Sequence, residues 1–359
     1  MSFCRYPRPY SIRVVLLVFN SIVRTFIGDY TIYVAFSAIY MIYQYLEGSI
    51  CCINARAHVQ YAAYLICHLE RGTMAKRAAR LRREQLSRMG FKEHPFRSSA
   101  DPRFLYLSSL HEDVLARLQG LVEWREGLGV IEGPIGTGKT SVARRLYELT
   151  TQDPQYRPVY IHTATYNTQL DAARDIARHF GLDSRRAYTD QLRDLEGLLV
   201  ELRKDEVTPV VIIDDAQLMS SDSLGTIQNI LNFDLREKLM QIVLIGQLEV
   251  HMNFAKQPAL LDRVAYWTKL GALPFNDMVS LLNFRLSVAG RAEPLFTDAA
   301  LTALYEFAAG IPRPMIMVCN EVLHSLAASG RDIADQEDIN QAIEIYNQRP
   351  EREFDGKEG

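Results

Sequence analysis

The sequence predicts an α/β fold followed by an all-helical part. Five apolar runs lie between residues 128 and 273 and alternate with segments of helical periodicity; they are 128–132, 158–162, 209–213, 241–246 and 266–273. Strands that alternate with helices favour a layered α/β architecture. From Asp277 onward only helical segments follow, and we expect helices at 277–289, 298–309, 313–328 and 335–347. The two patterns together predict a sheet domain and then a small helical domain.

The composition excludes several classes of protein. The 359 residues are 48% hydrophobic and 23% charged, with a formal net charge of −3, which is ordinary for a globular protein. Five Cys are too few for a disulfide-stapled scaffold. The eight His show no metal-binding spacing with Cys, and Cys319 lies on an apolar helix face, where we expect a core residue.

Residues 1–73 differ from the rest of the chain. They hold four of the five Cys and nine of the 18 Tyr, but no Lys. The stretch Tyr30–Leu46 runs 17 residues without a charge, which is the lower length limit for a membrane-spanning helix. Three interpretations stay open: a membrane anchor, a mis-assigned translation start with Met74 as the true start, and an unusual folded extension.

A basic segment follows this block. Residues 76–92 carry seven Lys and Arg against Glu84 alone. Such a segment can bind a nucleic-acid backbone or anionic lipid headgroups. We favour the simpler interpretation of 74–100 as a solvated leader.

A glycine-rich loop comes directly after the first apolar run. Leu128–Glu132 is followed by Gly-Pro-Ile-Gly-Thr-Gly-Lys-Thr, which matches the pattern G-x-x-x-x-G-K-[ST]. Glycines let successive backbone N–H groups point at one phosphate, and the start of the next helix, expected over Thr140–Leu149, favours the anion. The residues that we expect to contact a nucleotide are Gly133, Pro134, Ile135, Gly136, Thr137, Gly138, Lys139, Thr140 and Ser141.

The loop pattern and the strand that precedes it predict ATP and Mg²⁺ as ligands. Lys139 supplies a positive charge for the β- and γ-phosphates, and the Thr140 hydroxyl can coordinate Mg²⁺. An acid is then expected at the end of a second buried strand, and Asp214 and Asp215 follow the run 209–213. We expect Asp214 to coordinate the metal and Asp215 to act as the general base for an attacking water.

Three further polar residues complete the expected catalytic set. Gln247 ends the run 241–246 and can hydrogen-bond the γ-phosphate or the attacking water. Arg263 follows an expected helix and can reach the γ-phosphate of a neighbouring subunit. Arg313 opens an expected helix and can contact the nucleotide of its own subunit. We interpret His162, at another strand end, as structural.

With these motifs in view, residues 89–347 resemble AAA+ ATPases of the ExeA/GspA-like group, which lies close to transposition helpers of the TnsC, TniB and Mu B type. The lead-in Gly90–Phe96 and Asp101–Leu107 before His111 contributes to the resemblance. The resemblance further rests on the phosphate loop, Asp214-Asp215-Ala216-Gln217, the run ending at Gln247, and Gly310-Ile311-Pro312-Arg313. The chain departs from the group in having Asp215 where Glu is more usual.

The resemblance implies a P-loop fold of the AAA+ class, with a five-stranded parallel sheet and a helical lid. We therefore expect five segments: an extension over 1–73, a leader over 74–100, the ATPase domain over 101–275, the lid over 276–347 and a disordered tail over 348–359. The implied function is an oligomerising ATP-hydrolysing switch that acts on a macromolecular partner in secretion or export. It would work in the cytoplasm or at the inner face of the membrane.

Two alternatives remain open. One is a DNA-bound regulator of transposition or target selection, for which residues 76–92 would supply phosphate contacts. The other is an adaptor that binds nucleotide without hydrolysing it, which the shorter Asp215 keeps open. For the secretion or export switch we expect a homo-oligomer and a protein partner. DNA is the expected partner of the transposition regulator. A membrane contact is expected only if residues 1–73 belong to the protein.

Overall fold

The computed structural model describes residues 84–97, 101–233 and 237–348. The described residues all belong to one compact unit of the chain. The expectations for 1–73 and for most of the tail therefore fall outside the described residues. Within the described ranges, no helix combines the length and the hydropathy needed to span a bilayer.

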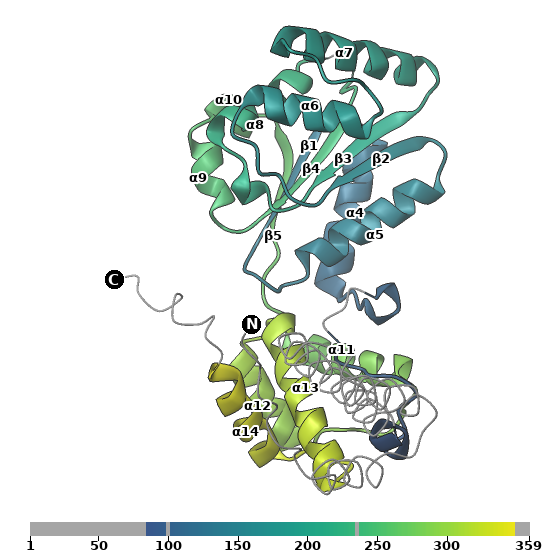
Figure 1. Ribbon diagram of the computed structural model, residues 1–359, viewed down its shortest axis with the longest axis vertical. Helices are drawn as coiled ribbons and strands as arrows, with labels where there is room; N and C mark the ends of the chain where they lie inside the picture. Colours follow the sequence, from purple (N-terminus) through teal and green to yellow (C-terminus); the bar gives the residue numbers. More distant parts are fainter. Residues whose placement is uncertain (1–83, 98–100, 234–236, 349–359) are drawn as a thin grey trace, which may run out of the picture. The chain divides into compact units, whose positions relative to one another are not determined.

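Five parallel strands form one sheet, as the sequence predicts (Figure 1). They are β1 (Leu128–Glu132), β2 (Tyr156–Ile161), β3 (Thr208–Ile213), β4 (Gln241–Gly246) and β5 (Val264–Lys269). The order across the sheet is β2-β3-β4-β1-β5. Because β4 pairs with both β1 and β3, the carboxyl ends of these three strands lie side by side.

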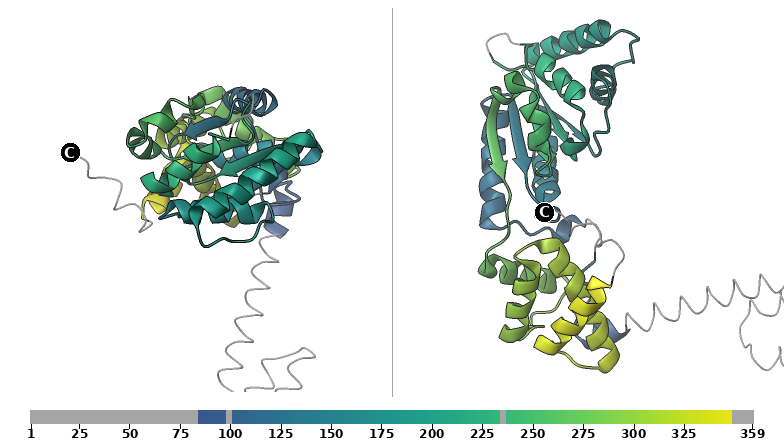
Figure 2. Two further views of the ribbon diagram at one scale, coloured as in Figure 1. Left: turned by 90° about the horizontal axis from the view of Figure 1, so that it is seen from above. Right: turned by 90° about the vertical axis from the view of Figure 1, so that its left-hand side faces the viewer.

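Helices cover both faces of the sheet (Figures 1 and 2). One face packs against α4 (Ser109–Glu123) and α5 (Lys139–Gln152). The other packs against α6 (Gln169–His179), α7 (Tyr188–Lys204), α8 (Ser221–Ile230), α9 (Val250–Ala255) and α10 (Pro258–Leu261). Alternate strand residues enter the two cores: Val130 faces one and Ile131 the other. Burial on both faces explains why the three central strands, β1, β3 and β4, read as largely apolar runs, whereas the edge strands β2 and β5 are partly exposed.

The helical domain contains α11 (Phe275–Val288), α12 (Asp298–Ala308), α13 (Pro312–Ser329) and α14 (Gln336–Asn347). The predicted helices agree with these to within about two residues at each end. Cys319 is fully buried in their shared core, as expected.

The segment before the sheet domain packs into this same core. Met89, Phe91 and Phe96 are buried among the side chains of the four helices, as is Phe104 of a short 3-10 helix, η1 (Pro102–Phe104). We expected residues 74–100 to form a solvated leader, but the described part, residues 84–97, contributes apolar side chains to the helical domain. The apolar residues that alternate with the charges of this segment are what attach it.

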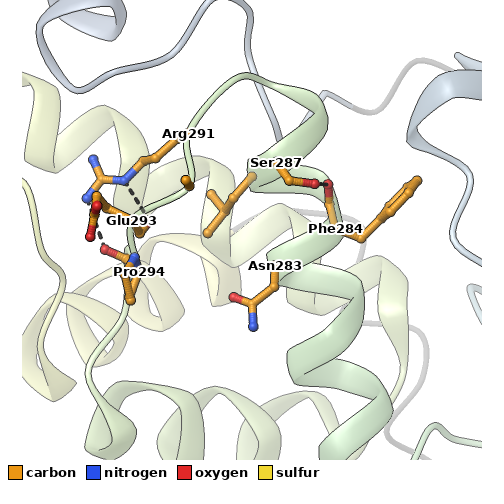
Figure 3. A pocket seen from close by; sticks show the side chains of 8 residues that line it. Asn283, Phe284, Ser287, Arg291, Glu293 and Pro294 are labelled. Atoms are coloured by element: carbon orange, nitrogen blue, oxygen red, sulfur yellow. Dashed lines mark hydrogen bonds between the residues drawn. The ribbon is translucent and has the colours of Figure 1, made fainter.

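One buried arginine holds this arrangement at the edge of an open surface pocket of about 510 Å³ (Figure 3). The Arg291 guanidinium donates to the carbonyls of Met89, Glu293, Pro294 and Asp332 at 2.8–3.0 Å. It therefore links the leading segment to two loops of the helical domain. Its donors are occupied by main-chain oxygens, so we assign it a structural role.

Candidate functional site

The glycine-rich loop joins β1 to α5 at the carboxyl end of the sheet. Its backbone enters the left-handed region at Gly136 (φ 87°) and Gly138 (φ 100°), which glycine adopts without a Cβ clash. No side chain caps the first turn of α5. A helix leaves its first N–H groups without intrahelical partners, so this terminus is suited to an anion.

Lys139 lies back against the loop. Its ammonium donates to the carbonyls of Gly133 and Pro134, each at 2.7 Å. Burial lowers the pKa of Lys139, and the negative charges of Asp214, Asp215 and Glu249 oppose that shift. Two main-chain carbonyl oxygens of the phosphate loop thus stabilise the ammonium group of Lys139.

Thr140 and Asp214 meet although 74 residues separate them in sequence. The Thr140 hydroxyl donates to Asp214 Oδ2 at 2.8 Å, and the Tyr160 hydroxyl donates to the same oxygen at 3.0 Å. Burial first, and then the Asp214 charge, raise the pKa of Tyr160, which keeps it a neutral donor. Sequence reasoning missed Tyr160, because an aromatic residue inside a buried strand reads as core.

The donor set fits Mg²⁺. A hydroxyl and a carboxylate oxygen next to a phosphate-binding loop are hard ligands, and Mg²⁺ takes its remaining ligands from substrate phosphates and water. Within the described ranges, no group of three or more His, Cys, Asp and Glu side chains is placed to hold a metal. Thr140 and Asp214 are therefore the residues that could hold such an ion.

Two hydrogen bonds through Gln217 connect Asp215 to the residue that follows the neighbouring strand, β4. Its backbone is left-handed (φ 53°), and Gln217 Nε2 donates to Asp215 Oδ1 at 3.0 Å. Gln217 Oε1 in turn accepts the Gln247 N–H at 3.1 Å. We expected Gln247 to hydrogen-bond the γ-phosphate or the attacking water; in the structure its main-chain N–H is joined to Asp215 through Gln217. Gln217 is part of the Asp-Asp-Ala-Gln motif, so the sequence could have indicated it, but we had assigned it no role.

The two arginines differ in their relation to the loop. Arg313, at the start of α13, donates its N–H to the Gly136 carbonyl at 3.3 Å, so the helical domain touches the phosphate loop. Arg263 lies between α10 and β5, and its side chain forms no hydrogen bond or ion pair to any described residue. His162 packs its ring against Tyr160, with 4.7 Å between centroids.

Two further side chains lie near the loop: His111 contacts its middle, and Glu132 comes directly before it in sequence. His111 of α4 reaches the Thr137 carbonyl at 2.9 Å. Glu132, the last residue of β1, is only 4% exposed, and its Oε2 lies 2.6 Å from His251 Nε2. The two atoms are close, but Glu132 Oε2 accepts no hydrogen bond from the described residues, so this is a short polar contact.

A family model described as "AAA domain" matches residues 123–253, which include the phosphate loop, both acids and Gln247. General secretion pathway protein A of Aeromonas hydrophila is 33% identical over 248 residues, which are 67% of this chain and 44% of that protein. The chain is an AAA+ protein.

Solved structures agree on the fold of this AAA+ protein. The ORC2 protein of Aeropyrum pernix, in ADPNP-ADP complexes, aligns with a TM-score of 0.55 at 17% identity and covers 72% of each chain. Cdc6p of Pyrobaculum aerophilum aligns with a TM-score of 0.53 at 20% identity, over 68% of this chain and 71% of its own. At such identities the likeness shows a P-loop AAA+ fold and no more.

The match has limits along the chain. The family model ends before Arg263 and Arg313, and this AAA+ protein spans less than half the length of the general secretion pathway relative. Both arginines therefore lie outside the residues that the family model matches.

Proposed function

We propose that this AAA+ protein binds MgATP at the Gly133–Ser141 loop and hydrolyses it. The observation that carries the proposal is the 2.8 Å contact between Thr140 and Asp214, which joins the phosphate loop to the acidic strand end. A phosphate, a divalent cation and an attacking water need their binding groups at one place, and this contact supplies that place. When bound, Mg²⁺ neutralises charge on the phosphates.

In this proposal the protein's own residues take distinct roles. The N–H groups of the loop and the Lys139 ammonium bind the phosphates, while Thr140 and Asp214 hold the metal. Asp215 takes the proton of the attacking water, and the Gln217 relay orients its carboxylate. Arg313 lies at the start of the helix that contacts Gly136, so its side chain can contact the γ-phosphate of the nucleotide bound in the same subunit.

The proposal extends to an assembly. Arg263 belongs to the sheet domain but makes no contact with its own subunit's described side chains by hydrogen bond or ion pair. An arginine left free in this way is available to the nucleotide of a second copy, where it would stabilise charge in the transition state. ATP would then order the oligomer, and hydrolysis would release it.

The partner that we propose is a protein of a secretion or export system. The 33% identity to general secretion pathway protein A supports this choice over transposition. Structures of ORC proteins, one of them the Aeropyrum pernix ORC1 protein in complex with DNA, align at 15–17% identity and carry the fold alone. They do not favour DNA as the partner of this chain.

Two variants test the enzyme assignment. We expect Lys139→Ala to weaken ATP binding at least tenfold, because it removes a charge-assisted contact. We expect Asp215→Asn to retain ATP affinity within about threefold and to lower phosphate release about 100-fold or more. Steady-state phosphate release and equilibrium binding of ATP measure the two effects.

The control is Asp215→Glu, which keeps a carboxylate and should retain turnover. Phosphate release absent from the wild type, with ATP bound normally, would instead establish the non-hydrolysing adaptor. Unchanged ATP affinity in Lys139→Ala would contradict the nucleotide site itself.

A further inference from the structure

His111 occupies the first turn of α4 and lies under the phosphate loop. Its side chain is only 2% exposed. Nδ1 lies 2.6 Å from Ser108 Oγ, and Nε2 lies 2.9 Å from the Thr137 carbonyl oxygen. One ring thus joins the cap of α4 to the middle of the loop.

The partners decide which nitrogen carries the proton. A carbonyl oxygen only accepts, so Nε2 must be the N–H that donates to Thr137. Nδ1 then accepts the Ser108 hydroxyl proton. Burial lowers the pKa of His111, which agrees with a neutral ring.

The contact fixes the direction of a second group. The described residues contain no cis peptide, and in a trans peptide the C=O and the following N–H point in opposite directions. The Thr137 carbonyl points at His111, so the Gly138 N–H points away from it. That N–H immediately precedes the uncapped first turn of α5.

The packing leaves this peptide little freedom. A Cβ at Gly138 would lie 2.5 Å from His111 Nε2, so the ring lies directly against the glycine. On the other side, the Thr137 hydroxyl donates to the Pro134 carbonyl at 3.0 Å. The Thr137 carbonyl and the Thr137 hydroxyl are thus each held by a hydrogen bond, and the His111 ring packs against Gly138.

We propose that His111 is a positioning residue that holds the Thr137–Gly138 peptide so that the Gly138 N–H is aimed at a bound phosphate. This proposal rests on the proposed nucleotide site and adds to it a residue outside the loop. Preorganised donors bind an anion without first reorienting, which is why fixing one peptide improves affinity for a phosphate.

Two substitutions separate the two ends of the ring. In His111→Asn the amide can take the place of Nδ1 and keep the Ser108 contact, but nothing reaches Thr137. In His111→Gln an amide N–H can take the place of Nε2 and keep the Thr137 contact. We expect Asn to weaken ADP binding about tenfold and Gln to stay within about threefold of wild type.

The measurement is equilibrium binding of ADP to the full chain, with thermal unfolding of the nucleotide-free protein alongside. If His111 merely capped α4, the order of the two variants in ADP affinity would be reversed, and His111→Gln would bind ADP more weakly than His111→Asn. That order, or wild-type affinity in Asn, overturns the proposal. If the wild type itself fails to bind ADP, the nucleotide site fails; if only the Asn effect is missing, the inference fails alone.

A measurement on the unaltered protein covers the case in which the variants do not fold. Nitrogen-15 NMR of the imidazole should show a neutral ring with the proton on Nε2. A proton on Nδ1 would contradict the donation to Thr137 and with it the proposal.

Discussion

At the scale of single residues, the site depends on hydrogen bonds that stabilise a buried carboxylate. Asp214 accepts from Thr140, Tyr160 and the Asp215 N–H, so its carboxylate is well supplied with donors in a place that is 7% exposed. Buried charges are tolerated when hydrogen bonds replace water. The same carboxylate and the Thr140 hydroxyl are the groups that would hold a metal ion in the proposed site.

His94 offers a test of burial at this scale. Its ring accepts the Phe96 N–H at 3.2 Å and lies 5.6 Å from the His324 ring. Burial first, and then the charges of His324 and Arg97, lower the pKa of His94 to about 4. The ring therefore stays neutral in the folded protein at pH values where the unfolded chain takes up a proton.

This shift predicts a pH dependence of stability. Between pH 6.5 and about 4 the unfolded state binds more protons, so the free energy of unfolding falls as the pH falls. The slope from one such group is at most about 1.4 kcal/mol per pH unit, and it is smaller here because the ring is only partly buried. Urea unfolding of His94→Asn and wild type at pH 7 and pH 5 should show a weaker dependence in the variant. Equal slopes would contradict the assignment.

At the scale of elements, the loop and the start of α13 are fitted to each other. A Cβ at Gly136 would lie 2.5 Å from Arg313 Cβ, and the Arg313 N–H donates to the Gly136 carbonyl. The glycine is thus needed for two reasons, its left-handed backbone and the approach of α13. If the loop moves when it binds phosphate, the contact between Gly136 and Arg313 would transmit that movement to α13.

Gly136→Ala tests this fit against a matched control. Gly181 has nearly the same backbone angle (φ 85°) but no atom within 4 Å of an added Cβ. Both substitutions should cost about 1–2 kcal/mol of stability for the left-handed backbone. We expect only Gly136→Ala to weaken ADP binding as well, by about tenfold or more, in equilibrium binding measurements. Equal ADP affinity in the two variants would show that the contact with α13 does not matter for the site.

At the scale of the whole molecule, the helical domain draws on both ends of the described chain. Met89, Phe91 and Phe96 lie in the same core as the four C-terminal helices, and Arg291 ties Met89 to that core. Residues 84–97 therefore belong to the helical domain by packing. Any motion of that domain would carry the leading segment with it.

The proposed assembly predicts complementation between subunits. Arg263→Ala should bind ATP normally but lose most turnover, because the missing guanidinium belongs to the neighbour's site. Lys139→Ala should be inactive for lack of bound nucleotide while retaining Arg263. In a mixture, Arg263 of a Lys139→Ala subunit can complete the site of a neighbouring Arg263→Ala subunit, whose phosphate loop is intact. Phosphate release should therefore partly recover. A mixture no more active than its components would place the arginine's effect within one subunit.

The fold was largely predictable because its determinants are local. Continuous apolar runs mark strands that are buried on both faces, and β1 was predicted to the residue. The loop pattern, the acids after β3 and the helix starts at Pro312 and near Asp335 are also written in short stretches of sequence. For the same reason, the resemblance to AAA+ proteins could be recognised from motifs alone.

The contacts that make a site could not be predicted in this way. Tyr160 on Asp214, Gln217 between Asp215 and Gln247, and His111 under Thr137 each join residues whose meeting depends on strand order and helix packing. Periodicity reports which face of an element is buried, and it carries no information on which distant side chain lies opposite.

The sequence by itself thus determined the α/β and helical parts, the phosphate loop and the acids, because these follow from local pattern and backbone chemistry. Only the tertiary structure decided that the leading segment joins the helical core and that α13 touches Gly136. It alone also showed that a histidine fixes a peptide of the loop. Those outcomes depend on side chains far apart in sequence sharing one buried space, and the packing of the whole chain sets which of them meet.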